Sequence, residues 1–386
     1  MNRLLAISLL ALGAGTAPAQ TPQTQAPHAQ GPADGVWLKG DLHVHSRHSK
    51  DSTNNSVGTI IAYAERIGID FLAITDHDNH VDGDTAHHTW ADPEWHSDRV
   101  VLLHAAEWTT DRGHGNVFAA APYDQKRLHD LRDARDGDLI ALKKRLGVHV
   151  SANHPTNKDH FGFSYDLVDS IEVWNTSVWP KNVSALDVWD DMLKSGRRLA
   201  ARGGSDSHHG TPPTPADRSP ASAERMANYV GTPTTWVFAR SREARAVIDA
   251  LTAGRASISA SPVDPRVELC ADLDGDGHCD AMMGDNQPAS GKPVTFHVRL
   301  VGGLIPWARY QVRVVRNGDD FAKLPLDADR GEITFADTPA RDSRFYYRVE
   351  VTGPQSPFPE VPMAAGLSGP MIAISNPIYF NFDPKF

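Results

Sequence analysis

The chain lacks a long apolar segment apart from one run near its N-terminus. That run covers residues 4–15, which is shorter than the roughly 20 residues that a membrane-spanning helix needs. Only 2 of the 386 residues are cysteines, Cys270 and Cys279, so at most one disulfide can form within the chain. The sequence therefore argues against a helix that spans a membrane.

The chain also lacks an excess of positive charge. Lysine and arginine together number 38 and aspartate and glutamate 48, which gives a net charge of -10, and no basic stripe is visible. This balance argues against nucleic acid as the main partner. There is no low-complexity segment and no repeat with a period of about 20 to 50 residues. With 40% hydrophobic and 22% charged residues, the length suits one large globular domain and a smaller one.

The N-terminus has the three parts of a secretory signal peptide. Arg3 precedes the apolar run, and the small-residue site Ala17-Pro18-Ala19 precedes Gln20. We expect residues 1–19 to be a signal peptide and the protein to be exported, either periplasmic or secreted. Residues 20–35 are rich in Pro, Gln, Ala and Thr, so we interpret them as a linker.

Short apolar runs alternate with helical patterns between residues 36 and 260. Strands are expected at 36–45, 70–76, 100–108, 115–120, 147–153, 170–175, 198–206 and 229–239. Helices are expected at 59–68, 138–147, 183–196 and 241–254, each ending in a glycine that suits a C-terminal cap. This alternation predicts an α/β fold with a parallel-stranded barrel or sheet, whose active site gathers at the carboxyl ends of the strands.

The pattern changes after residue 260. The segments 293–302, 307–318, 331–337 and 345–353 are β-branched and aromatic, are separated by turn residues and carry no helical period. We therefore predict that residues 261–386 form a small antiparallel, sandwich-like β domain.

An acidic loop lies near the start of this second region. Asp272, Asp274 and Asp276, with Asp280 at the ninth position, match the opening of a calcium loop, but the twelfth position is Met283 instead of glutamate. A Ca²⁺ site and a solvated acidic turn both stay open. Cys270 and Cys279 flank the loop, and in an exported protein we expect them to form a disulfide, the alternative being a pair of free thiols.

Histidines and carboxylates gather at the predicted strand ends. Residues 41–210 contain 16 of the 19 histidines. Residues i and i+2 of a strand face the same way, which gives three same-face pairs: His43 with His45, His114 with Asn116, and Asp206 with His208. A surface strand with polar side chains would explain one such pair, but recurrence at several strand ends predicts a multinuclear metal centre.

Four more positions belong to the same pattern. Glu107 follows an apolar strand, where a carboxylate is costly unless it is paired or bound to metal, whereas His104 faces the other way and is expected to be structural. His154 precedes a proline, which predicts an extended backbone. Asp76 and His77 are adjacent and should diverge, so periodicity leaves open which of them reaches the metals.

Taken in order, these motifs resemble a known family. They are His-x-His at 43–45, Thr-Asp-His at 75–77, the strand-end Glu107, Gly-His-x-Asn at 113–116, Asn-His-Pro at 153–155 and Ser-Asp-Ser-His at 205–208. Their combination is similar to the polymerase and histidinol phosphatase (PHP) family of metal-dependent hydrolases. Segments 171–175, 185–198 and 203–208 are similar to its carbaryl hydrolase branch. The resemblance covers about residues 36–260 and implies a distorted (β/α)7 barrel with a trinuclear metal site.

The resemblance also implies a ligand set for three divalent ions, for which Zn²⁺, Mn²⁺ and Fe²⁺ are all candidates. The first ion would be held by His43, His45, Glu107 and Asp206. The second would share Glu107 with His114 and His154, and the third would use Asp51, His77 and His208. The resemblance thus favours His77 over Asp76 as the ligand, and Asp76 would orient a ligand side chain. The residues expected to act in catalysis are Glu107, Asp206, His154 and Asp76.

The chain departs from the family at one ligand. Family members often carry an acidic residue five positions after the second histidine of His-x-His, where this chain has Lys50. Asp51 lies one position further and is our predicted ligand, with His48 as the first alternative.

The charge of such a centre indicates its chemistry. Three divalent ions would outweigh the carboxylates of Glu107, Asp51 and Asp206, so the centre attracts anionic oxygens and hydroxide. Metal coordination lowers the pKa of water from about 15.7 to about 7. We therefore predict hydrolysis of a small, anionic phosphoester by a metal-bound hydroxide. The alternatives are a carbamate or carboxyl ester hydrolase of the carbaryl hydrolase type, and a non-catalytic module whose β domain binds a cell-surface polymer.

Some side chains near the motifs give weaker signals. Cations that could hold a phosphate, or simply face solvent, are Arg47, Lys50, Arg112, Lys158, Lys181 and Arg202. Trp108, Trp174 and Trp179 could line a pocket for an aromatic leaving group, although tryptophans are more often part of a core.

Overall fold

The structure is a computed structural model of the chain, and it describes residues 34–52, 56–79, 89–156, 158–208, 229–356, 358 and 370–383. The predicted signal peptide, residues 1–19, and all but the last two residues of the predicted linker lie outside the described residues. Among the described helices, none is long and apolar enough to cross a membrane.

The metal-ligand motifs lie on one half of a large mixed sheet. Strands β1 (Val36–Val44), β2 (Phe71–Ile74) and β3 (Val101–Thr110) pair in parallel, as do β5 (His149–Ala152), β6 (Ser170–Asn175) and β7 (Ala200–Gly204). Strand β4 (Gly113–Ala119) is antiparallel to both β3 and β5 and joins the two groups. On the other side of β1, β8 (Thr234–Ala239) and β9 (Ala256–Ser259) are antiparallel.

The expectation of a parallel arrangement is therefore wrong at β8, which pairs antiparallel with β1, and at β4. Only Asp111 and Arg112 separate β3 from β4, and a parallel crossover needs a dozen or more residues, so this pair has to be a hairpin. The turn was visible in the sequence as Asp-Arg-Gly, at the point where Gly113 adopts a φ of 123°.

The four helices expected from the sequence are present as α1 (Val57–Arg66), α3 (Asp136–Leu146), α4 (Val183–Lys194) and α6 (Ala244–Thr252). The structure adds α2 (Gln125–Asp130), which is too short to give a helical period, and the 3-10 turns η1 (Thr89–Ala91), η2 (Tyr165–Leu167) and η3 (Trp179–Asn182). Gly147 ends α3 in the left-handed conformation, as predicted for a glycine cap.

Strand β7 returns to β1 only at its carboxyl end. The His45 amide donates to the Ser207 carbonyl at 2.9 Å, and the Asp206 amide donates to the His43 carbonyl at 2.8 Å. Along the described residues the strand path is otherwise open between β7 and β1. The fold is thus a mixed α/β sheet with few helices, and the (β/α)7 barrel stays a prediction. The two backbone bonds place the ends of β1 and β7 side by side.

The C-terminal strands form two sheets that share one hydrophobic core. A four-stranded sheet contains β10 (Arg266–Asp272), β11 (Ala281–Met282), β13 (Val294–Val301) and β16 (Glu332–Asp337). The large sheet continues with β12 (Asn286–Gln287), β14 (Arg309–Arg316), β15 (Asp319–Asp327), β17 (Phe345–Thr352), β18 (Met371–Ser375) and β19 (Ile378–Phe380). Leu269 and Phe296 from the first sheet pack in one cluster with Val312 and Val349 from the second.

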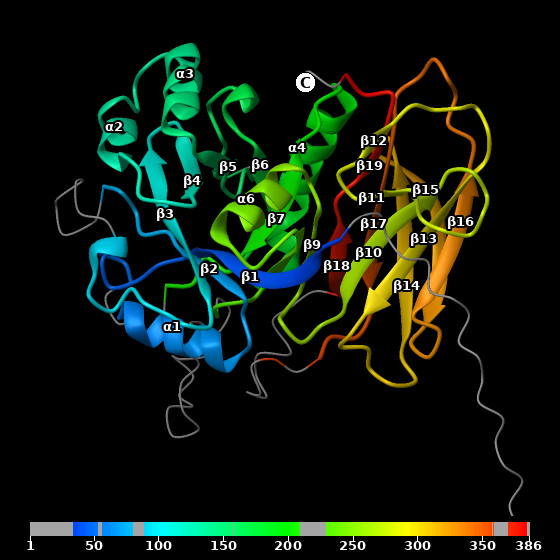
Figure 1. Cartoon of the computed structure of the whole chain (residues 1–386), viewed down its shortest axis with the longest axis horizontal. Helices are drawn as coiled ribbons and strands as arrows, with labels where there is room; N and C mark the ends of the chain where they lie inside the picture. Colours follow the sequence, from blue (N-terminus) through cyan, green and yellow to red (C-terminus); the bar gives the residue numbers. More distant parts are fainter. Residues whose placement is uncertain are drawn as a thin grey trace, which may run out of the picture.

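The large sheet runs across the boundary predicted at residue 260. Strand β9 pairs with β18, so the helix-bearing part and the β-rich part in Figure 1 are joined by hydrogen-bonded strands. Just after β18, the Asn376 side chain accepts a hydrogen bond from the Ala201 amide and donates to the carbonyls of Ala201 and Ala256. Asn376, which lies near the C-terminus, thus links β7 to β9 through its hydrogen bonds.

The acidic loop is closed by a disulfide between Cys270 and Cys279, as predicted. The Asp272 carboxylate accepts hydrogen bonds from the amides of Gly275 and Gly277 at 2.7 and 2.9 Å. These bonds account for the shape of the turn without an ion, and Ca²⁺ binding by the loop stays a prediction.

Candidate metal centre

The structure brings all nine predicted ligand residues to one region of the sheet. His43 is on β1, with His45 and Asp51 following it, and His77 follows β2. Glu107 is on β3, His154 follows β5, and Asp206 and His208 follow β7. His114 is at the amino end of β4, which reaches the same region because β4 runs antiparallel to its neighbours.

Four of these side chains surround a common point. His43 Nε2 lies 3.5 Å from Glu107 Oε1 and 3.3 Å from Asp206 Oδ1, while His45 Nε2 lies 3.4 Å from Glu107 Oε2 and 3.1 Å from the same Asp206 oxygen. Tetrahedral ligands about 2.0–2.2 Å from one ion are roughly 3.3–3.6 Å apart. The four donors therefore have the spacing of a single metal site.

The atoms of this set are buried and poorly hydrogen-bonded. Within the described part of the chain, His43 Nε2 and His45 Nε2 have no hydrogen-bond partner. Buried polar atoms without a partner are costly, so two imidazole nitrogens that converge on the same carboxylates fit a cation as the missing partner.

The Glu107 carboxylate also contacts histidines on its other side. Its Oε2 lies 2.8 Å from His77 Nδ1, and its Oε1 lies 3.2 Å from His114 Nδ1 and 3.6 Å from His154 Nε2. Since Glu107 is only 1% exposed, imidazoles provide most of its polar environment. This position is the one that a ligand shared between two ions would occupy.

Asp159 is a member of the cluster that the sequence reasoning missed. Its Oδ2 lies 2.5 Å from His154 Nδ1, and the donor atoms of Asp159, His154 and His114 lie within 4.8 Å of one another. The signal available was an acidic residue five positions after His154 in the same loop.

Asp51 reaches the third predicted group. Its Oδ2 lies 3.5 Å from His77 Nε2 and 3.4 Å from His208 Nε2. Lys50 is exposed, and His48 is directed to the Asp92 carboxylate at 2.7 Å. Of the alternatives considered for this ligand, Asp51 is therefore the one that the structure brings to His77 and His208.

Glu172, which was not predicted, contacts the cluster through His43. Its carboxylate contacts His43 Nδ1 at 3.1 Å and accepts a hydrogen bond from Arg202 Nη1 at 2.7 Å. Arg202 also donates to Asn153, whose own Nδ2 donates to Glu107 Oε1 at 2.8 Å. Neither a phosphate-binding nor a surface role is correct for Arg202, because the side chain is fully buried in this network.

Asp76 orients the loop that carries His45. It accepts four hydrogen bonds, two from Ser46 and one each from the hydroxyls of Ser49 and Thr89. The Ser49 hydroxyl in turn lies 3.1 Å from His45 Nδ1. Asp76 is thus connected to the donor cluster through Ser49.

His104, predicted to be structural, packs against Trp90 and Trp95.

Two of the candidate ligand residues have a left-handed backbone. The φ of Asp206 is 50° and that of His154 is 26°, so the extended conformation predicted for His154 is wrong. The preference imposed by the following proline is overcome locally, because the His154 amide donates to Glu172 and its ring contacts Asp159. Such conformations are costly and gather at functional sites.

Close packing explains the glycine at position 204, two residues before Asp206. A Cβ on Gly204 would lie 2.5 Å from both Glu172 Oε1 and His43 Cβ. Glycine is therefore required here for space.

The buried carboxylates and imidazoles of the cluster shift one another's pKa values. Burial alone would lower the pKa of His43, but the carboxylates of Asp206, Glu172 and Glu107 outweigh it and raise the pKa to about 10. Burial alone would raise the pKa of Glu107, but His77 and His43 hold it well below its usual range. Interleaved carboxylates and imidazoles of this kind give a divalent cation the negative ligands it requires.

Comparisons with known proteins add one structural neighbour. No family model and no curated protein matches the chain. A similar solved structure is the crystal structure of a two-domain protein containing a predicted PHP-like metal-dependent phosphoesterase from Bacteroides vulgatus ATCC 8482. The match covers 91% of this chain and 99% of that one, with 17% sequence identity and a TM-score of 0.42. The carbaryl hydrolase branch stays a prediction.

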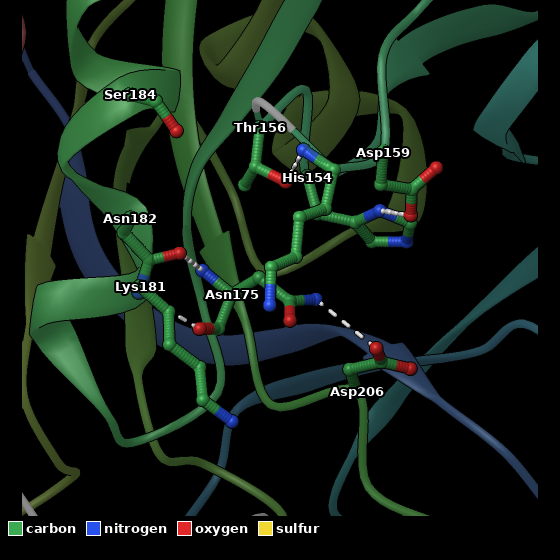
Figure 2. A pocket seen from close by; sticks show the side chains of 9 residues that line it. His154, Thr156, Asp159, Asn175, Lys181, Asn182, Ser184 and Asp206 are labelled. Atoms are coloured by element: carbon green, nitrogen blue, oxygen red, sulfur yellow. Dashed lines mark hydrogen bonds and ion pairs between the residues drawn. The ribbon is translucent and has the colours of Figure 1, made fainter.

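A pocket of about 520 Å³ opens beside the cluster, and the residues that line it carry polar side-chain ends. Figure 2 shows His154 and Asp206 on one side and Lys181, Asn182 and Ser184 on the other. Asn175 spans the gap, because its Nδ2 donates to Asp206 Oδ2 at 3.2 Å. The pocket therefore adjoins the candidate metal ligands directly.

The three tryptophans considered as pocket residues belong to the hydrophobic core. Trp108, Trp174 and Trp179 pack in one buried cluster, and none of them lines this pocket. Of the six cations considered, Lys158 and Lys181 line it. Arg112 pairs with Asp136, and Arg47 pairs with Asp92.

Proposed function

We propose that the chain is a metal-dependent hydrolase that cleaves phosphoesters at a trinuclear centre. The observation that carries this proposal is the donor set of His43, His45, Glu107 and Asp206, with contacts of 3.1–3.5 Å. It fits one ion without rearrangement of the side chains. His114 and His154 would complete a second set around Glu107, and Asp51, His77 and His208 a third.

Ions held there would activate water at neutral pH and would attract the oxygens of a phosphate ester. The chain's own residues fix the geometry. Asn153 holds one Glu107 oxygen, and Asn175 holds Asp206 Oδ2, so that Asp206 Oδ1 faces His43 and His45. Asp206 and His154 are the candidate ligands that border both the cluster and the pocket, and we infer that substrate enters beside them.

Export is part of the proposal. It is supported by the signal-peptide pattern at residues 1–19 and by the disulfide between Cys270 and Cys279, because disulfides persist mainly in oxidising compartments.

The pocket favours a phosphoester over an aryl carbamate. A naphthyl group packs best against aromatic side chains, whereas Trp108, Trp174 and Trp179 are in the core and, among the described residues, no tryptophan, tyrosine or phenylalanine lines this pocket. The lining includes Lys158 and Lys181, whose positive charge attracts an anionic phosphoester more than a neutral carbamate.

A substrate panel on protein of measured metal content tests the proposal. We expect turnover of p-nitrophenyl phosphate or bis-p-nitrophenyl phosphate, loss of turnover after chelation, and recovery when divalent metal is restored. Hydrolysis of naphthyl acetate or naphthyl methylcarbamate alone would instead support an ester or carbamate hydrolase. Glycan binding by metal-loaded protein without any turnover would support a binding module.

A pair of variants links turnover to the metal. Glu107→Gln keeps the shape but removes the charge shared by the ligand sets, so metal content and turnover should both fall, turnover by more than the about 10- to 100-fold typical of a supporting residue. Glu243→Gln removes the same charge at an exposed position and should change neither. A Glu107→Gln protein with full metal and a normal rate would contradict the assignment.

A further inference from the structure

The pocket beside the cluster has an unusual lining. All nine side chains around it end in polar groups, from His154 and Asp206 at the cluster to Lys181 and Ser184 on the far side. Pockets for small molecules are normally lined by apolar and aromatic side chains with a few polar groups, whereas the apolar part of this wall consists of the carbon stems of polar side chains. An occupant can therefore form hydrogen bonds with the side-chain ends while its carbon atoms contact these stems.

The carboxylates in the pocket form ion pairs within the protein, whereas the ammonium groups do not form any with the described residues. Its two carboxylates are already paired with imidazoles, Asp206 with His43 and His45 and Asp159 with His154. Its two ammonium groups, on Lys158 and Lys181, form no ion pair with any of the described residues. The positive charge available to an occupant therefore exceeds the negative charge, which favours an anion.

The lysine on the far wall is held on a fixed segment. Lys181 lies in the 3-10 turn η3, and its neighbour Asn182 is buried. The Asn182 side chain accepts from the Asn175 amide at 2.8 Å and donates to the carbonyls of Asn175 and Val178. These bonds hold the turn at the end of β6, and Lys181 and Asp206 both line the pocket.

We propose that this pocket binds the leaving group of the substrate, and that the leaving group is a hydroxyl-rich alcohol with a second phosphate. The scissile phosphate would lie at the metal ligands, and Lys181, together with Lys158, would hold the second phosphate. This inference rests on the proposed function and specifies its substrate class as a polyol or sugar bisphosphate.

The test compares substrates that differ by one phosphate. Metal-loaded protein should hydrolyse fructose 1,6-bisphosphate with a kcat/KM at least about 10-fold above those for fructose 6-phosphate and 1-naphthyl phosphate, as expected for a charge-assisted hydrogen bond. Lys181→Gln should reduce the preference for the bisphosphate over the monophosphate by about 10- to 100-fold, mainly through KM. Lys144→Gln, which removes the same charge on the exposed side of α3, should leave the preference unchanged.

Two outcomes would overturn the inference. An equal loss with both fructose phosphates in Lys181→Gln would place the lysine on the scissile phosphate, and a preference of the unaltered protein for 1-naphthyl phosphate would show that the pocket takes aryl groups.

A binding measurement separates this inference from the proposed function. Calorimetric binding of fructose 1,6-bisphosphate that weakens in Lys181→Gln, in protein that hydrolyses no phosphoester, would retain the pocket and reject the phosphoesterase. Turnover of p-nitrophenyl phosphate without a bisphosphate preference would do the reverse.

Discussion

Arg348 of strand β17 forms a buried ion pair with Asp190 of helix α4. The guanidinium contacts both carboxylate oxygens, at 2.5 and 3.1 Å, and Arg348 is fully buried. Arg348 also donates to Glu350, and the Tyr346 hydroxyl donates to Asp190. The β-rich part of the chain thus holds the helix that directly follows the turn carrying Lys181.

Breaking this pair should destabilise the protein strongly. Arg348→Met leaves the Asp190 charge buried, and we expect the free energy of unfolding in urea to fall by about 3–5 kcal/mol. The double variant Arg348→Met with Asp190→Leu should recover much of the loss, because no unpaired charge remains. Arg309→Met, which removes an exposed pair with Asp327, should cost less than about 1 kcal/mol. A single Arg348 variant as stable as the Arg309 control would contradict the prediction.

Asp51 should be required for one ion in three. Because it lies within 3.5 Å of a nitrogen on each of His77 and His208, Asp51→Ala should give folded protein with about two ions in place of three and much slower turnover. Lys50→Ala, at the adjacent exposed position, should keep all of its metal. Elemental analysis decides the question, and a fully loaded Asp51→Ala protein would reduce the centre to two ions.

Glu172 should act on the metal through His43. Glu172→Gln weakens the contact that orients the His43 ring, and changes of this kind typically cost about 10- to 100-fold in metal affinity. Equilibrium dialysis against a metal buffer measures the effect, and urea unfolding of the metal-free proteins shows separately how much stability is lost. Glu268→Gln, in a partly exposed carboxylate on β10, is the matched control. Equal metal affinity in both variants would remove Glu172 from this role.

His149 should make stability fall in mild acid. It is buried on β5 between the hydroxyls of Thr252 and Ser170, and burial lowers its pKa to about 4. The unfolded chain binds this proton near pH 6.5, so the contribution is complete above pH 6.5 and is lost as the pH falls toward 4. From pH 7 to pH 5 the loss from this group is about 2 kcal/mol.

The variant His149→Gln isolates that contribution. It cannot titrate, so its free energy of unfolding should fall less than that of the unaltered protein over the same pH range, at equal metal loading. Parallel pH dependences of the two proteins would show that His149 is not the group responsible.

The candidate ligands that the structure brings together were recognisable in the sequence because they follow local rules. His43 and His45 share one face of a strand, and Glu107 ends an apolar strand where a lone carboxylate is costly, so each stands out within a few residues. Glu172 and Arg202 did not stand out, because each lies within an ordinary strand pattern and is explained only by its partner on the neighbouring strand. The pairing of strands that are distant in the sequence is the information that a local pattern lacks.

The side chain of Asn376 sets an order for the folding of the chain during synthesis. It completes the backbone hydrogen bonds of Ala201, five residues before Asp206, although the ribosome makes it 175 positions later. Until Asn376 and β18 emerge, the edges of β7 and β9 stay open to other partners. A nascent chain can therefore contain most of the candidate metal ligands well before β7, the strand that precedes Asp206, has all of its hydrogen-bond partners.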